Sequence, residues 1–159
     1  MVEVVLSVGD KAPDFRIPDP SGQLKCLKDF AGKWLVLYFY PKDNTPGCTI
    51  EAIDFSYLRD DFLKLNAVIC GISKDSCASH QKFMDKKSLT IILLSDNDHT
   101  VQEAYGVWRM KKFMGRDFMG TIRSTFLIGP DGVIARIWDN VEVADHALSV
   151  LEAIKGMGD

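Results

Sequence analysis

The sequence predicts an α/β fold with a mixed central sheet and helices on both of its faces. Two observations predict it. Continuous apolar runs, typical of strands buried on both faces, alternate with segments whose apolar residues recur every three or four positions, as in amphipathic helices. The last third of the chain changes to the pattern of an antiparallel hairpin and a helix. A length of 159 residues suits one domain, so we expect residues 1–159 to form a single domain.

The first two thirds of the chain are predicted to begin with a β-hairpin and then to alternate strands and helices. The predicted segments are a strand at Trp34–Tyr40 that Pro41 ends, a helix from about Cys48 to Lys64, a strand at Ala67–Ile72, a helix at Ser73–Lys87 capped by Ser73 or Asp75, a strand at Leu89–Leu94 and a short helix at Thr100–Tyr105.

The last third is predicted to complete the sheet. Ser124–Ile128 and Val133–Trp138 are expected to pair as an antiparallel hairpin around the turn Gly129–Gly132. Apolar residues at helical spacing across Ala147–Ile154 predict a closing helix. Between these parts, Met110–Gly120 is expected to be a solvated loop, with contact to a substrate as the alternative.

Charge and apolar content exclude several classes of protein. The chain has 19 basic and 22 acidic residues and a formal net charge of −3, whereas nucleic-acid binders usually carry a basic stripe. No apolar run approaches the roughly 20 residues that cross a bilayer. No cationic leader precedes the apolar residues at the N-terminus. We therefore expect a cytoplasmic protein that binds neither nucleic acid nor membrane.

The cysteines do not form a metal-binding or dithiol motif. There are four of them and no C-x-x-C pair, which argues against a zinc site and against a dithiol redox site. The three histidines also lack the spacing of metal ligands, so we expect no metal. Because a cytosolic thiol is reduced by default, a functional cysteine has to be recognised from its surroundings.

Cys48 has such surroundings. It follows Pro46-Gly47 at the start of a predicted helix, where free N–H groups and the positive end of the helix dipole stabilise a thiolate. The position also follows the carboxyl end of a buried strand, where open α/β sheets place ligands. Thr45 precedes the cysteine by three residues, so a turn can bring its hydroxyl near the sulfur. The alternative is an inert buried cysteine beside a proline-rich turn.

The pattern Pro41-x-x-x-Thr45-x-x-Cys48 resembles the signature of the peroxiredoxins, which are thiol peroxidases with an elaborated thioredoxin fold. Further stretches are similar to the peroxiredoxin Q branch, also called bacterioferritin-comigratory proteins: Gly9–Phe15, Lys33–Lys42, Thr45–Glu51, Gly71–Asp75 and Arg123–Ile128. Together they span nearly the whole chain in order. The resemblance implies a thioredoxin-like fold with an N-terminal β-hairpin extension.

The resemblance also implies roles for individual residues. Cys48 would be the nucleophile that attacks the peroxide O–O bond, and Thr45 would donate a hydrogen bond to the thiolate and the peroxide. Pro41 would shield the sulfenic acid that forms, and Arg123 would be the cation over the site. Attack needs an ionised sulfur and donors aimed at the departing oxygen, and a guanidinium remains charged at every relevant pH.

The chain departs from the family pattern in the second thiol. The resemblance implies a resolving cysteine five residues after Cys48 or on the next helix, but Ile53 and Met84 occupy these positions. Cys77, two helical turns before Met84, is the candidate substitute. The alternative is that Cys77 only serves as a small apolar residue at the start of a helix. A one-cysteine cycle with an external thiol is the alternative route.

Two further residues are candidates for supporting parts. Glu51 either takes part in catalysis or is an acid placed in the first helical turn by the dipole. Tyr40 is a core residue that could also pack against the pocket.

The expected activity is the reduction of hydrogen peroxide and organic hydroperoxides to water or alcohols, without a cofactor. The resemblance implies thioredoxin as the reductant, with glutaredoxin or glutathione as alternatives, and a monomer or weak homodimer. Two rival functions remain. One is a thiol–disulfide oxidoreductase of the same fold, which the missing C-x-x-C disfavours. The other is a thioredoxin-like binding or chaperone module without catalysis.

Overall fold

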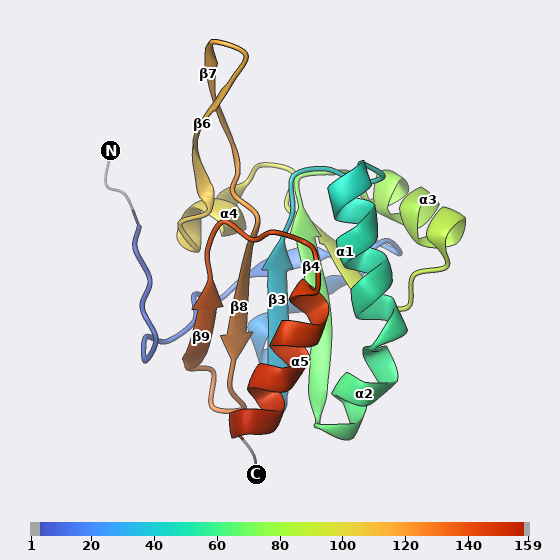
Figure 1. Cartoon of the computed structure of the whole chain (residues 1–159), viewed down its shortest axis with the longest axis vertical. Helices are drawn as coiled ribbons and strands as arrows, with labels where there is room; N and C mark the ends of the chain where they lie inside the picture. The colour runs from blue at the N-terminus through green and yellow to red at the C-terminus, as the bar shows by residue number, and fades with distance from the viewer. Residues whose placement is uncertain (1–3, 158–159) are drawn as a thin grey trace.

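A computed structural model describes residues 4–157 and is built around a five-stranded sheet (Figure 1). Residues 1–3, to which part of the leader argument applies, lie outside the described range. The strand order is β5 (Ile92–Ser95), β4 (Ala67–Ser73), β3 (Trp34–Phe39), β8 (Ser124–Ile128) and β9 (Ile134–Trp138). Strands β3, β4 and β5 run parallel, whereas β8 is antiparallel to both β3 and β9. The predicted mixed sheet is confirmed.

Strand β3 lies at the centre because its sequence can be buried on both faces. Val36, Tyr38 and the following Tyr40 point into one apolar core, and Leu35, Leu37 and Phe39 point into the other. This alternation follows from the period of two residues in a strand. A continuous apolar run is therefore compatible with a central strand covered on both sides.

Helices cover both faces, as predicted. On one face lie α1 (Pro46–Tyr57), α2 (Arg59–Lys64), α3 (Cys77–Lys87) and α5 (His146–Met157), which contribute residues such as Phe55, Phe83 and Val150 to the first core. Figure 1 shows α1, α2 and α5 in front of the sheet. The other face is covered by α4 (Thr100–Ala104), the short helix η1 (Leu27–Phe30) and the antiparallel N-terminal hairpin of β1 (Arg16–Pro18) and β2 (Leu24–Cys26). None of the described helices has the length and apolar character that a membrane span requires.

Two predicted helices have different boundaries in the structure. The single helix expected at 48–64 begins earlier, at Pro46, and is interrupted at Leu58, where the backbone leaves helical geometry between α1 and α2. Phe62 still reaches the same core as Phe55, so the apolar spacing hides the interruption. The helix expected from Ser73 starts at Cys77, because the Ser76 hydroxyl accepts a hydrogen bond from the backbone N–H of Ser79 and caps it.

The prediction of a loop at Met110–Gly120 was wrong. Strands β6 (Trp108–Phe113) and β7 (Arg116–Thr121) pair there as an antiparallel hairpin that projects from the body of the molecule (Figure 1). Met114 and Gly115 connect them with φ angles of 50° and 77°, as two-residue hairpin turns require. Most of the ribbon is exposed on both faces, so the apolar alternation of a half-buried strand is missing from its sequence.

Candidate active site

Cys48 lies in the first turn of α1, just beyond the carboxyl end of β3. The segment 40–45 connects the two elements, Thr45 is the N-cap residue and Pro46 opens the helix. The side chain is only 2% exposed, and it belongs to the first core, in the helical turn whose N–H groups have no partner within the helix. The cysteine that the sequence singled out is therefore buried at a helix N-terminus on the sheet edge where it was expected.

Arg123 reaches Cys48 from the start of β8, the strand next to β3. Strand β8 pairs with β3 so that Ser124 lies opposite Phe39, which places the preceding residue, Arg123, beside the end of β3. One guanidinium nitrogen, Nη2, donates to the Cys48 sulfur at 3.3 Å. A Cβ at position 47 would lie 3.2 Å from that nitrogen, so Gly47 leaves room for the guanidinium.

The same guanidinium also binds Glu51, one helical turn after Cys48. Its Nη1 donates to Oε1 of Glu51 at 2.7 Å, and this carboxylate is fully buried. Burial raises the pKa of Glu51 to about 7 even though Arg123 opposes the shift. Burial would lower the pKa of Arg123, but Glu51 and the Cys48 sulfur outweigh it and raise the pKa above its usual value. Arg123 is therefore a cation shared by two acidic groups.

The remaining candidates lie in the segment before α1. Pro41 is half-buried at the start of this segment. The Thr45 hydroxyl donates to the backbone carbonyl of Lys42 at 2.9 Å, rather than to the Cys48 sulfur. Tyr40 is buried, and its hydroxyl donates to Asp43 at 2.6 Å. The structure thus places Pro41 and Thr45 in the loop that precedes Cys48, and it directs the Tyr40 hydroxyl into a separate polar network.

That network was not found from the sequence. The Asp43 carboxylate lies 2.7 Å from Nδ1 of His80 and accepts a hydrogen bond from the Ser79 hydroxyl at 2.8 Å. The other ring nitrogen of His80, Nε2, lies 3.0 Å from the carbonyl oxygen of Leu94. Each ring nitrogen of His80 thus has an oxygen atom within hydrogen-bond distance. The partners lie 37 positions apart in the chain, and no local pattern connects them.

Asp43, Asp75 and His80 are also the residues whose type and closeness would suit a metal ion, since their ligand atoms lie within 4.8 Å of one another in the described part of the chain. Hydrogen bonds already use these atoms: Asp75 accepts from the backbone N–H of Asp43 at 2.8 Å and from the Ser73 hydroxyl at 2.7 Å. The arrangement is therefore that of a hydrogen-bonded structural network.

The other cysteines differ sharply in environment. Cys77 is the first residue of α3 and is half-buried, and Ser79 and His80 in the same helical turn contact Asp43. Cys70 is fully buried in β4, where burial raises the pKa of its thiol well above the usual value. Cys26 is half-buried near Asp29 in the N-terminal hairpin. Both α3, which carries Cys77, and β4, which carries the fully buried Cys70, contact the segment before Cys48, since the backbone N–H of Tyr40 donates to the carbonyl of Ile72 at 3.1 Å.

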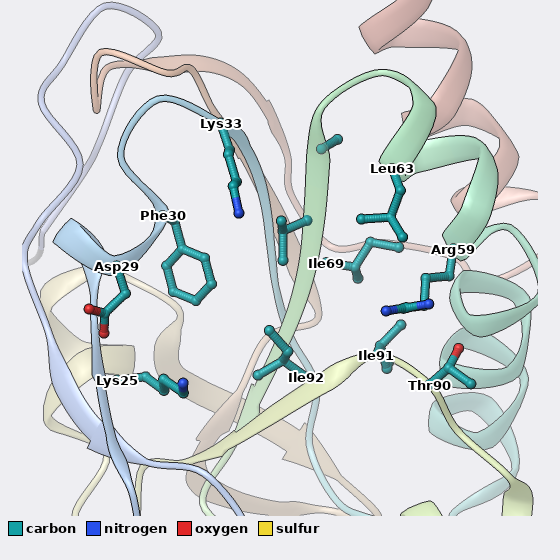
Figure 2. A pocket seen from close by; sticks show the side chains of 12 residues that line it. Lys25, Asp29, Phe30, Lys33, Arg59, Leu63, Ile69, Thr90, Ile91 and Ile92 are labelled. Atoms are coloured by element: carbon teal, nitrogen blue, oxygen red, sulfur yellow. The ribbon is translucent and has the colours of Figure 1, made fainter.

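A pocket of about 260 Å³ lies elsewhere, where β4 and β5 begin. Figure 2 shows Lys25, Lys33, Phe30 and Arg59 around it. It lies toward the amino ends of these strands, whereas Cys48 and Arg123 lie at the carboxyl end of β3. This pocket is therefore separate from the candidate active site.

Comparison with known proteins agrees with this geometry. The AhpC/TSA family model matches residues 8–137. Peroxiredoxin Bcp of Bacillus subtilis is 44% identical over 156 residues, which is 98% of this chain and 99% of that protein. Among solved structures, a Xylella fastidiosa PrxQ mutant has a TM-score of 0.93 at 37% identity and covers 98% of this chain and 99% of its own.

A second solved structure is the bacterioferritin comigratory protein of Xanthomonas campestris, with a TM-score of 0.87 at 41% identity, covering 91% of this chain and 92% of its own. That protein was studied for alkyl peroxide reduction. The chain belongs to the AhpC/TSA family and, within it, to the peroxiredoxin Q or Bcp branch, and it is a thiol-dependent peroxidase of hydroperoxides.

Proposed function

We propose that Cys48 is the nucleophile of this peroxidase and that Arg123 is the cation that activates it. The observation that carries the proposal is the 3.3 Å contact between the guanidinium and the sulfur at the first turn of α1. A cation and a helix N-terminus together favour the thiolate, which is the reactive form. The scarcity of water around the buried sulfur strengthens both interactions.

The proposed reaction begins with attack of the Cys48 thiolate on one peroxide oxygen. The O–O bond breaks, the sulfur becomes a sulfenic acid, and the other oxygen leaves as an alkoxide or hydroxide that takes a proton. Charge moves from the sulfur to the leaving oxygen during this step. The remaining N–H groups of Arg123 and of the helix start are suited to stabilise that charge because they are already oriented.

Three neighbouring residues receive supporting roles. A rotation of the Thr45 side chain away from the Lys42 carbonyl would direct its hydroxyl to the sulfur or the peroxide. Pro41, which has no N–H to donate, is suited to cover the sulfenic acid without reacting with it. Glu51 fixes the guanidinium through its 2.7 Å hydrogen bond, which supports a positioning role. Tyr40 supports the same loop through Asp43.

We propose Cys77 as the resolving thiol. Its helix contacts the segment before Cys48 through Ser79, His80 and Asp43, which supports proximity of the two cysteines. The Cys77 thiol would displace water from the sulfenic acid and form a disulfide. Because Cys48 is buried and a disulfide needs Cα atoms within about 7 Å, we expect the first turn of α1 to open locally for this step.

The finer assignments follow from this cycle. Hydrogen peroxide and alkyl hydroperoxides are the proposed substrates, and thioredoxin is the proposed reductant, with glutaredoxin or glutathione as alternatives. A cycle that depends on thiol donors is suited to a reducing compartment, which supports a cytoplasmic location. We propose a single domain that acts as a monomer or a weak homodimer.

The test is disulfide mapping by mass spectrometry after one equivalent of hydrogen peroxide, in the wild type, C48S, C77S and M84C. We expect a Cys48–Cys77 disulfide in the wild type, a sulfenic acid on Cys48 in C77S, and no fast peroxide consumption by C48S. M84C, which restores a thiol at the position usual in the family, serves as a positive control for disulfide formation. A stable Cys48 sulfenic acid or glutathione adduct in the wild type would show that an external thiol, and not Cys77, resolves the sulfenic acid. Equal oxidation of all four cysteines would contradict the role of Cys48.

A further inference from the structure

The hairpin of β6 and β7 exposes large apolar side chains to solvent. Phe113 is 66% exposed and Met114 is 85% exposed at its turn, and Met110, Phe118 and Met119 are exposed along its length. Soluble proteins seldom keep several such side chains together on one projecting element, and such a patch commonly marks an interaction site. Figure 1 shows that the hairpin projects into solvent at the end of the sheet where β3 ends.

The hairpin also differs in charge from the rest of the chain. Residues 108–121 contain four cations and one anion, a net charge of +3, although the whole chain carries −3. Arg109 pairs with Asp139, and the Lys111 ammonium donates to the carbonyl of Thr121. Lys112 and Arg116 are exposed near the turn, in strands that place them beside the apolar side chains. A partner for this surface would therefore combine apolar area with acidic groups.

The base of the hairpin is directly connected to the active site. Strand β7 ends at Thr121, two residues before Arg123, whose guanidinium contacts the Cys48 sulfur. The side chain of Lys111 reaches this base through its hydrogen bond to the Thr121 carbonyl, and burial and the nearby Arg123 lower its pKa. A macromolecule seated along the hairpin would thus reach the edge of the sheet at which Cys48 must be reduced.

The distribution of apolar side chains indicates a folded protein as the partner. Met110 pairs with Met119 across the ribbon on one face, while Phe118 and Phe113 lie on the opposite face. Apolar area therefore extends from the turn toward the base. A bilayer would take only the tip of such a ribbon, whereas a protein surface can pack along its length.

We propose that the β6–β7 hairpin is the docking surface for a protein dithiol reductant that presents an apolar face with an acidic rim. The inference rests on the proposed function, in which an external thiol donor returns Cys48 to the thiol state. In each cycle the hydroperoxide takes two electrons from Cys48, and the two thiols of the reductant return them. One hydroperoxide and one dithiol give one alcohol, one water and one disulfide.

The experiment compares two reductants in steady-state peroxide consumption. Thioredoxin, recycled by its reductase, is the protein probe, and dithiothreitol is the small-molecule probe that needs no docking surface. We expect K112E/R116E to raise KM for thioredoxin about tenfold and to weaken its dependence on salt. F113S/F118S is expected to raise the same KM without changing the salt dependence. Turnover with dithiothreitol is expected to stay at the wild-type value in both variants.

K28E/K33E is the matched control because it changes the net charge by the same amount on exposed lysines. Lys33 immediately precedes β3, whereas Cys48 follows the other end of that strand. The control is expected to leave KM for thioredoxin unchanged. An equal rise of KM in the control and the hairpin variant would overturn the proposal, and so would an unchanged KM in both hairpin variants.

Other occupants of the hairpin are distinguished by two more measurements. Loss of a wild-type dimer in sedimentation of the hairpin variants would assign the surface to a second copy, and loss of binding to anionic phospholipid vesicles would assign it to a membrane. Either result, with KM for thioredoxin unchanged, would overturn the proposal. If the wild type consumed no peroxide with dithiothreitol, the proposed function itself would fail and the docking proposal with it.

Discussion

At the scale of single residues, the chemistry depends on how one guanidinium is divided between two acidic groups. Arg123 donates one N–H to the Cys48 sulfur and another to the buried Glu51 carboxylate. A guanidinium can do this because its donors form a rigid planar fork, whereas an ammonium is a compact point charge. Glu51 thus holds the fork in place and also competes with the sulfur for its charge.

Replacing Arg123 tests this arrangement. We expect R123M to slow Cys48 oxidation by hydrogen peroxide by about 10²–10³-fold, because it removes donors aimed at the reacting atoms, and R123K to recover only part of the rate. The measurement is the second-order rate constant in stopped-flow. R123M/E51Q also removes the carboxylate that R123M leaves without its partner. An equally slow rate in this double variant would show that the loss is not due to unfolding. R136M, at an exposed arginine on β9, is the matched control, and a near-normal rate in R123M would remove Arg123 from catalysis.

The sequence predicts part of this site. Cys48 and Thr45 belong to one short motif, so their proximity needs only local chain geometry. Arg123 was assigned by resemblance, and the pairing of β3 with β8 explains why it reaches a sulfur 75 positions away. The Asp43–His80 pair belongs to no motif, because it depends on how α3 packs beside the loop, which is a property of the assembled fold.

At the scale of elements, the segment 40–45 is held on both sides. The side chain of Asp43, in the middle of this segment, is bound by three residues. Tyr40, which directly follows β3, binds it from one side, and Ser79 and His80 of α3 bind it from the other. A buried carboxylate that several groups hydrogen-bond is costly to remove, because those groups are then left without a partner. The network therefore fixes the loop that precedes the nucleophile.

We expect D43N to lower the free energy of unfolding by about 3 kcal/mol, because the buried Tyr40 hydroxyl and the His80 ring lose a carboxylate partner. The local effect should exceed the global one, with faster hydrogen exchange at residues 42–48 than in strand β5. Urea unfolding and exchange followed by mass spectrometry measure the two effects. D60N, in the exposed Arg59–Asp60 pair, should change stability by less than about 1 kcal/mol. Uniform acceleration of exchange in D43N would show that Asp43 stabilises the fold without holding the loop.

Which elements the sequence predicts depends on burial. Strands β3 and β4 are buried on both faces, so their continuous apolar runs identify them. Strands β6 and β7 have no core to face, and their cations and apolar residues follow no period that burial would impose. The interruption at Leu58 was missed for a related reason, since apolar spacing reports the face of a helix and not its continuity.

At the scale of the whole molecule, the charge of Arg123 affects the pKa values of Glu51 and His146 as well as contacting Cys48. Burial, and then Arg123, lower the pKa of His146 at the start of α5 to about 4, while burial raises the pKa of Glu51 to about 7. The folded state therefore favours the neutral form of both groups. Their effects on stability have opposite signs in the same range of pH.

Stability measured against pH separates the two groups. Glu51 contributes stability below its unfolded pKa of 4.5, and this is lost as the pH rises toward 7. His146 contributes stability above its unfolded pKa of 6.5, and this is lost as the pH falls toward 4. We expect the two slopes to offset each other in the wild type between pH 4.5 and 6.5. Relative to the wild type, E51Q should then gain stability as the pH rises and H146Q should lose it, each by up to about 3 kcal/mol in urea unfolding.

The control for this experiment is E152Q, which changes charge at an exposed position of α5 and should keep the wild-type slope. Glutamine at position 146 can keep the hydrogen bond that joins the ring to the Thr125 hydroxyl at 2.8 Å, so a change in slope would report titration and not lost packing. If E51Q and H146Q both followed the wild-type pH dependence, neither group would be held neutral by the fold. Arg123 would then act on Cys48 alone, and its charge would not be shared across the interface between α1 and α5.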